Sequence, residues 1–144
     1  MSVLSMKFND EEMERILSEL LAFPDETITA GVYCTFQDTG FFASASHITA
    51  GYVGLTSRGR LVGLRAGMLS SEQINMDLNC MTKIKTKKGL LGSRTVYLEC
   101  LGGGTDKVKF IVTPRISGQK ITHQQENFEI LMGELEGRAH AIGC

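Results

Sequence analysis

A chain of 144 residues, 42% of them hydrophobic and 22% charged, has the size and composition of one globular domain, which excludes a disordered protein. Its 15 basic and 16 acidic side chains leave a formal net charge of −1 instead of the basic excess of a nucleic-acid-binding domain, so nucleic acid is not an expected partner. The sequence contains neither a signal peptide nor a run of about 18 apolar residues, so we expect a soluble, cytoplasmic protein without a transmembrane segment.

Residues 9–22 carry several signals of a helix. Asn9 is a favourable N-cap, and Glu12 can close a capping box with it. Apolar side chains then recur every three or four positions, at Met13, Ile16, Leu17, Leu20 and Leu21. Pro24 restricts the residue before it and is expected to end the helix.

From residue 28 the apolar side chains alternate with polar ones, which is typical of half-buried strands. Strands are predicted at 28–36, 51–56, 60–66, 72–78, 95–101 and 107–113, and a further strand carries Lys83, Lys85 and Lys87 on one face. The links between these segments are short and rich in glycine. We therefore expect antiparallel hairpins, because a parallel crossover needs a dozen or more residues.

A second helix is predicted to begin near Thr122, which can form a capping-box pair with Gln125. Its apolar seam consists of Phe128, Leu131, Met132 and Leu135. Gly137 is expected to stop the helix, leaving 138–144 as a loosely held tail, with an extension of the seam through Ala139 and Ile142 as the alternative. Residues 1–144 should thus form one mostly β (α+β) domain, with the helix of 9–22 as an extension.

The cysteines are widely spaced and include no C-x-x-C pair. Because a zinc site normally brings at least one close pair of ligands, we predict no metal site. Cys34 and Cys100 fall on the apolar side of strand-like stretches, which indicates buried thiols. Disulfides would be expected only if the chain were secreted.

Two segments resemble the bacterial pleckstrin-homology-like domain: GYVGLTSRGRLVGL (51–64) and MTKIKTKKGLLGSRTVYLE (81–99). In that family a strand ending in threonine and a basic turn leads into an apolar strand, and a later hairpin has a turn similar to 88–93. The resemblance covers roughly 27–136. It implies a bent, partly open antiparallel barrel of six to seven strands, capped by the C-terminal helix. It also implies a non-enzymatic interaction or assembly module that self-associates.

The loop after the first strand departs from the lipid-binding members of the larger pleckstrin-homology group. Those domains hold phosphoinositide headgroups with basic residues in and around this loop. Here the loop, 37–48, contains no lysine or arginine. Headgroup recognition at that position is therefore not expected.

A basic run is the first candidate binding site. It consists of Lys83, Lys85, Lys87, Lys88 and Arg94, with Lys107 and Lys109 nearby in sequence. The interpretation we favour is a solvated sheet face whose charges guard the sheet against unwanted pairing. The alternative is a local patch that binds an anion, which could be phosphate, RNA or an acidic membrane surface.

Phe41 and Phe42 are candidates for an interface between subunits. They lie in GFFASASHITA, a stretch of small residues without charge. They either pack within an ordinary strand or loop or form an exposed apolar patch that pairs two copies of the chain.

Catalysis has the least support, because no serine or cysteine motif accompanies the three histidines. The G-x-x-G of 89–92 lies between strand-like segments, so it is interpreted as a hairpin turn and not as a KH-domain loop. We therefore expect no enzyme and no cofactor, but a self-associating interaction module, with another protein as a second kind of partner. The alternatives are an anion binder that uses the lysine-rich strand and a small-ligand carrier.

Overall fold

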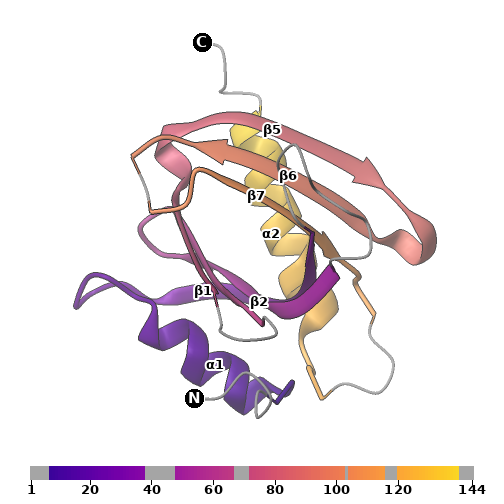
Figure 1. Ribbon diagram of the computed structural model, residues 1–144. Coiled ribbons are helices and arrows are strands. Elements are labelled where there is room, and N and C mark those ends of the chain that lie inside the picture. Colours follow the sequence, from indigo (N-terminus) through magenta and orange to yellow (C-terminus); the bar gives the residue numbers. More distant parts are fainter. Residues whose placement is uncertain (1–6, 38–47, 67–71, 103, 116–119, 140–144) are drawn as a thin grey trace.

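The computed structural model describes residues 7–37, 48–66, 72–102, 104–115 and 120–139. Its helices are α1 (Asp10–Glu19) and α2 (Gln124–Ala139), and two short 3-10 turns cover Leu78–Cys80 and Leu90–Gly92. The strands are β1 (Ile28–Gln37), β2 (Ile48–Thr56), β3 (Arg60–Arg65), β4 (Glu72–Asp77), β5 (Met81–Lys88), β6 (Arg94–Cys100) and β7 (Lys107–Val112). The predicted mostly β fold with a helix near each end is confirmed (Figure 1).

All seven strands belong to one antiparallel sheet in the order β4-β3-β2-β1-β7-β6-β5. The sheet bends so that β5, β6 and β7 lie across from β1 and β2, with α2 running along the space between (Figure 1). Within the described residues the edge strands β4 and β5 do not pair with each other, so the sheet stays open. This openness agrees with the expected partly open barrel.

The bend is centred on β1, which pairs with β2 along its whole length but with β7 only at Thr35–Gln37. The buried side chain of Gln124 in α2 takes the place of a neighbouring strand beyond that point. Its Oε1 accepts from the Tyr33 N–H at 2.9 Å, and its Nε2 donates to the carbonyls of Tyr33 and Thr113 at 2.9 and 3.0 Å. Asn127 donates to the Gly31 carbonyl at 2.9 Å. A helix therefore satisfies backbone groups that a sheet normally satisfies.

The main hydrophobic core lies between the bent sheet and α2. Leu131, Met132 and Leu135 of α2 are buried there and Phe128 packs against it, which confirms the predicted seam. Cys34 and Cys100 are buried free thiols, as predicted. Burial raises the pKa of both, that of Cys100 to about 11.

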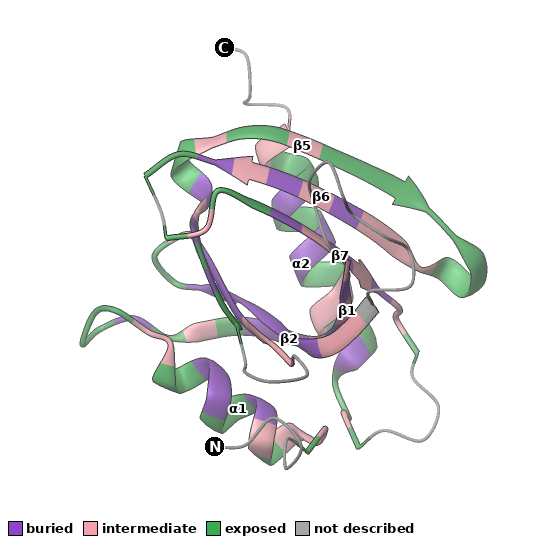
Figure 2. Cartoon of the chain, viewed as in Figure 1, coloured by how far each residue is buried: buried purple, intermediate pink, exposed green. Residues whose placement is uncertain are grey.

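A second, smaller core forms where α1 covers the outer side of β1, β2 and β3. Met13, Ile16 and Leu17 of the helix are buried against Tyr52 and Val62 of the sheet, and Figure 2 shows the purple stripe along α1. The helix can approach this closely because the sheet presents glycine there. A Cβ added to Gly31 or Gly54 would lie 2.8 or 2.9 Å from Leu17 Cδ1.

The two terminal regions are joined directly. The Asp10 N–H donates to the Lys120 carbonyl at 3.0 Å, and the Thr122 N–H donates to the Asp10 carboxylate at 3.0 Å. The Thr122 hydroxyl donates to the same carboxylate at 2.5 Å. The predicted capping box of Thr122 and Gln125 is therefore wrong. The Thr122 side chain is bonded to Asp10 of α1, and α2 begins only at Gln124.

The helix boundaries also differ from the expectation. Asn9 caps α1 as predicted, because its Oδ1 accepts from the Glu12 N–H at 2.7 Å. The helix ends at Glu19 instead of residue 22, with Leu20 as its C-cap. Gly137 does not stop α2, which continues to Ala139. One glycine costs only about 1 kcal/mol in a helix interior, so the packed seam outweighs it.

Candidate anion-binding site

β5 is an edge strand that presents three lysines on the outer side of the sheet. Ile84 of β5 packs against the main core, so Lys83, Lys85 and Lys87, which alternate with it, point to the opposite face. Figure 2 shows that most of this strand is exposed. Sequence periodicity alone predicted this shared face, and the structure places all three lysines on it.

The strand register extends this lysine row across β6 and β7. Lys85 lies opposite Tyr97 of β6, and Tyr97 lies opposite Lys109 of β7. In the next row, Lys83 lies opposite Glu99, and Glu99 lies opposite Lys107. We call this surface the basic face: Lys83, Lys85, Lys87, Lys107 and Lys109, with Thr95, Tyr97 and Glu99 between them. Among these described residues, five lysines face one glutamate, an excess of four positive charges.

Part of the basic face is hollowed to a volume of about 750 Å³. The hollow is lined by Lys83, Lys85, Thr86, Lys87, Thr95, Tyr97 and Lys109. The Lys83 ammonium lies 3.7 Å from the Glu99 carboxylate and 6.0 Å from the centre of the Tyr97 ring. Burial and the Glu99 carboxylate raise the pKa of the Tyr97 hydroxyl.

The structure separates two of the predicted patch residues from this face. Arg94 lies on the side of the sheet that carries α2, where its Nη1 donates to Glu136 at 3.1 Å. Lys88 is the register partner of Arg94, so it belongs to that same side. The basic run of the sequence is therefore divided between the two faces of the β5–β6 hairpin. Lys107 and Lys109 join the basic face through register, which sequence reasoning did not use.

The other predicted positions bring no further site together. Phe41 and Phe42 lie outside the described residues, so the interface prediction stays a prediction. The G-x-x-G of 89–92 is the turn of the β5–β6 hairpin, as expected. His123 is exposed and lies 3.6 Å from Glu126 of its own helix turn. In the described part of the chain, no three side chains of the His, Cys, Asp and Glu types gather where they could hold a metal ion.

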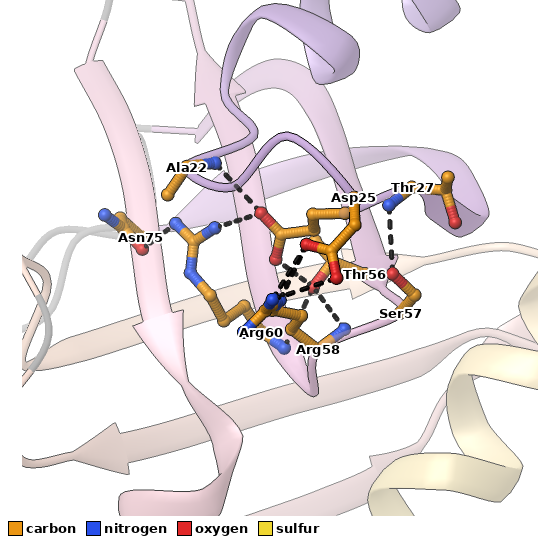
Figure 3. Close-up of polar contacts among 9 residues, drawn as sticks. Ala22, Asp25, Thr27, Thr56, Ser57, Arg58, Arg60 and Asn75 are labelled. Carbon is orange, nitrogen blue, oxygen red and sulfur yellow. Dashed lines mark hydrogen bonds and ion pairs between the residues drawn. The ribbon is translucent and has the colours of Figure 1, made fainter.

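A buried ion pair between Glu26 and Arg60 is a polar feature that the sequence did not reveal (Figure 3). The Glu26 side chain is 0% exposed, and its Oε1 lies 2.7 Å from Arg60 Nη1. It also accepts from the Thr56 hydroxyl at 2.6 Å and from the Ala22 N–H at 2.9 Å. Arg60 is further held by the Asn75 amide oxygen at 2.6 Å.

These contacts decide the ionisation of Glu26. Burial opposes the charged form, but the bonds from Thr56, Ala22 and Arg60 outweigh it and keep the Glu26 pKa below its usual range. Every donor around the carboxylate comes from the chain itself. The pair thus ties the segment after α1 to the β2–β3 turn, which is a structural role.

A second hollow, of about 630 Å³, lies between α1, the start of β1 and the start of α2. Asp10, Met13, Leu17, Gly31, Thr122 and Asn127 are among its lining residues. Asp10, Thr122 and Asn127 already bond within the chain, so they hold the helices in place. The basic face is the better candidate because its lysines are directed outward.

Comparison with known proteins does not identify a family or a function for the chain. No family model matches the chain, and no curated protein does. Among solved structures, the C-terminal domain of an unknown protein from Leishmania infantum is similar, with 13% sequence identity and a TM-score of 0.43. The match covers 76% of this chain and 84% of that chain. No helix among the described residues combines the length and apolar character needed to cross a bilayer.

Proposed function

We propose that this protein is a non-enzymatic, pleckstrin-homology-like interaction module that binds a polyanionic partner through the basic face. The observation that carries the proposal is the set of five lysines that the strand register gathers around Tyr97, with one carboxylate among them. Ammonium groups donate up to three hydrogen bonds each and accept none, so they suit phosphate oxygens.

The position of the lysines favours binding over edge protection. Lysines that guard a sheet against pairing with another chain are needed only on the edge strand, which here is β5. Lys109 lies two strands further in, on β7, where it pairs with Gln37 of β1 and no edge needs a guard. The presence of lysine on β7 is explained if the whole basic face serves as one binding surface.

The spacing of the lysines favours an extended anion over a single small one. Adjacent strands lie about 4.8 Å apart, so the lysines of β5 and β7 start about 10 Å from each other. Along β5, successive lysines of this face are separated by about 7 Å. One phosphate cannot span these distances, whereas a chain or surface that carries several phosphates can.

The test uses charge reversal with a matched control. Lys85→Glu combined with Lys109→Glu changes the basic face, and Lys7→Glu combined with Lys120→Glu makes the same change in net charge elsewhere. The probe is a fluorescently labelled inorganic polyphosphate, titrated at two salt concentrations. Each lysine near an anionic surface contributes about 1 kcal/mol, so the first variant should bind about tenfold more weakly or worse.

The control variant should bind as the unmodified protein does. The slope of log affinity against log salt should fall by about two in the first variant, one for each lost contact. Equal polyphosphate affinity of the two variants, or no binding by the unmodified protein, would refute the proposal.

A further inference from the structure

The tip of the β5–β6 hairpin has an unusual backbone. The Gly89 N–H donates to the Ser93 carbonyl at 2.9 Å, and the Ser93 N–H donates to the Leu90 carbonyl at 3.0 Å. Leu91 has φ 58° and ψ 29°, and Gly92 follows with φ 78°. Leucine rarely adopts the left-handed region, and Leu91 is the one non-glycine residue with a positive φ in the described part of the chain. The turn is thus well bonded and holds Leu91 in a conformation that leucine does not favour.

This turn exposes two neighbouring leucines almost completely. Leu90 is 88% exposed and Leu91 is 89% exposed, more than the other large apolar side chains that the described residues expose. Leu101, the next in order, is 66% exposed. Phe23 is partly covered by the Arg58 guanidinium, 4.2 Å from its ring centre. A turn of this shape needs no leucine for its own stability. The two exposed leucines therefore suit contact with another molecule.

Basic residues surround the leucines on both sides of the hairpin. Lys87 belongs to the basic face and Lys88 to the opposite face, where its register partner Arg94 is paired with Glu136 of α2. The sequence contains no Asp or Glu between Asp77 and Glu99. The hairpin is therefore an apolar tip on a positively charged stem, which we call the leucine tip (Leu90 and Leu91).

We propose that the leucine tip inserts into an acidic phospholipid bilayer while the lysines of the hairpin contact the lipid headgroups. This inference rests on the proposed function, because it identifies the polyanionic partner of the basic face as a membrane surface. The site differs from the segment between β1 and β2, where residues 38–47 include no lysine or arginine.

The dimensions of the hairpin agree with insertion at the interface. A strand rises about 3.3 Å per residue, so Lys87 and Lys88 start about 7–10 Å behind the leucines. Interfacial segments bury their apolar side chains about 5–10 Å deep, at the boundary between headgroups and acyl chains. When the leucines reach that boundary, the lysine ammonium groups stand at the level of the lipid phosphates.

The arrangement of charge favours a lipid surface over a pocket in a protein partner. The leucines protrude, and a lysine stands behind them on each face of the stem, Lys87 on one and Lys88 on the other. An occupant must therefore be apolar at the centre and anionic on every side. A planar acidic bilayer meets this condition in any rotation of the hairpin about its axis.

The first experiment measures sedimentation with vesicles of phosphatidylcholine alone or with about 30% phosphatidylserine. The protein should bind the acidic vesicles and not the neutral ones. Leu90→Ser combined with Leu91→Ser should weaken this binding by about tenfold or more, the order expected from removing two buried leucines. Leu101→Ser, a change at another exposed leucine, should have no effect. Polyphosphate binding should be the same in all three proteins.

The second experiment uses the absence of tryptophan from the sequence. Leu91→Trp introduces a single fluorophore at the tip, and Leu101→Trp is its control. Acidic vesicles should shift the emission of the tip tryptophan to shorter wavelength and leave the control unchanged. This readout reports entry into an apolar environment, which electrostatic adsorption alone would not produce.

Each alternative outcome has a defined meaning. Unchanged vesicle binding by the serine pair, or no shift for Leu91→Trp, overturns insertion and leaves the polyanion proposal standing. Binding to polyphosphate but not to acidic vesicles identifies a soluble polyanion as the partner and also overturns insertion. Binding to neither probe refutes both proposals.

Discussion

Replacing Glu26 by glutamine removes a charge from the interior while keeping the shape of the side chain. The Glu26 carboxylate is 0% exposed, and the Arg60 side chain is 10% exposed. Removing one member of a buried ion pair typically costs about 3–5 kcal/mol, because it leaves the other charge without compensation. Arg60 keeps its bond to Asn75, and glutamine can still accept from Thr56 or Ala22. We therefore expect a loss of about 3 kcal/mol, the lower end of that range.

Arg60→Met should cost more than Glu26→Gln, since it leaves a fully buried carboxylate without its cation. The double variant Glu26→Leu with Arg60→Met should cost clearly less than the sum of Glu26→Leu and Arg60→Met made separately. Urea unfolding at pH 7, followed by far-ultraviolet circular dichroism, measures all of these free energies. A loss below about 1 kcal/mol for Glu26→Gln would refute the reasoning.

The pH dependence provides an independent check on the same pair. The Glu26 pKa is lowered in the folded protein, so the unfolded state binds a proton more readily. The stabilisation is therefore complete above the unfolded pKa, near 4.3, and is lost as the pH falls through the lower, folded pKa. The stability difference between the unmodified protein and Glu26→Gln should shrink over that acidic range. A difference that stays constant as the pH is lowered would contradict the assignment.

Two further predictions concern the closure of the sheet and the interface between subunits. Gln124→Leu should destabilise the fold by about 2–3 kcal/mol in urea unfolding, because the Tyr33 and Thr113 backbone groups lose their partner in a buried place; Gln125→Leu, at a neighbouring exposed position, is the control. From the sequence alone, we predict that the protein is a homo-oligomer and that Phe41→Asp with Phe42→Asp weakens it. Light scattering that finds the unmodified protein monomeric at micromolar concentration would contradict this expectation.

The sequence predicted the parts of the fold that depend on local periodicity. Alternation in 28–36 and 107–113 gave strands, and the three- and four-residue spacing from Met13 gave the first helix, because these patterns follow directly from which side faces the core. The second helix was also predicted, but its cap was not. Thr122 bonds to Asp10, a residue 112 positions earlier, and no local pattern reveals a partner at that distance.

Local periodicity also predicted part of the candidate site. Lys83, Lys85 and Lys87 share a face by alternation, which the sequence shows. Their meeting with Lys109 across Tyr97 depends on the register of three strands, which turn lengths alone do not fix. The division of Lys88 and Arg94 onto the other face follows from the same alternation, and strict use of it would have found this. The exposure of Leu90 and Leu91 could not be predicted from the sequence, because it depends on the backbone conformation of the turn.

The bond between the start of α1 and the segment before α2 has a consequence for biosynthesis. Thr122 leaves the ribosome 112 residues after Asp10, so the two partners are synthesised far apart in time. α1 can pack on β1–β3 early, with the Asn9 N–H already donating to the Tyr52 hydroxyl of β2, but Asp10 finds its own partners only when the segment before α2 has been made. Translation should therefore produce a nascent domain in which the contact between Asp10 and Thr122 is missing, and the start of α1 is more open to proteases or chaperones, until α2 emerges.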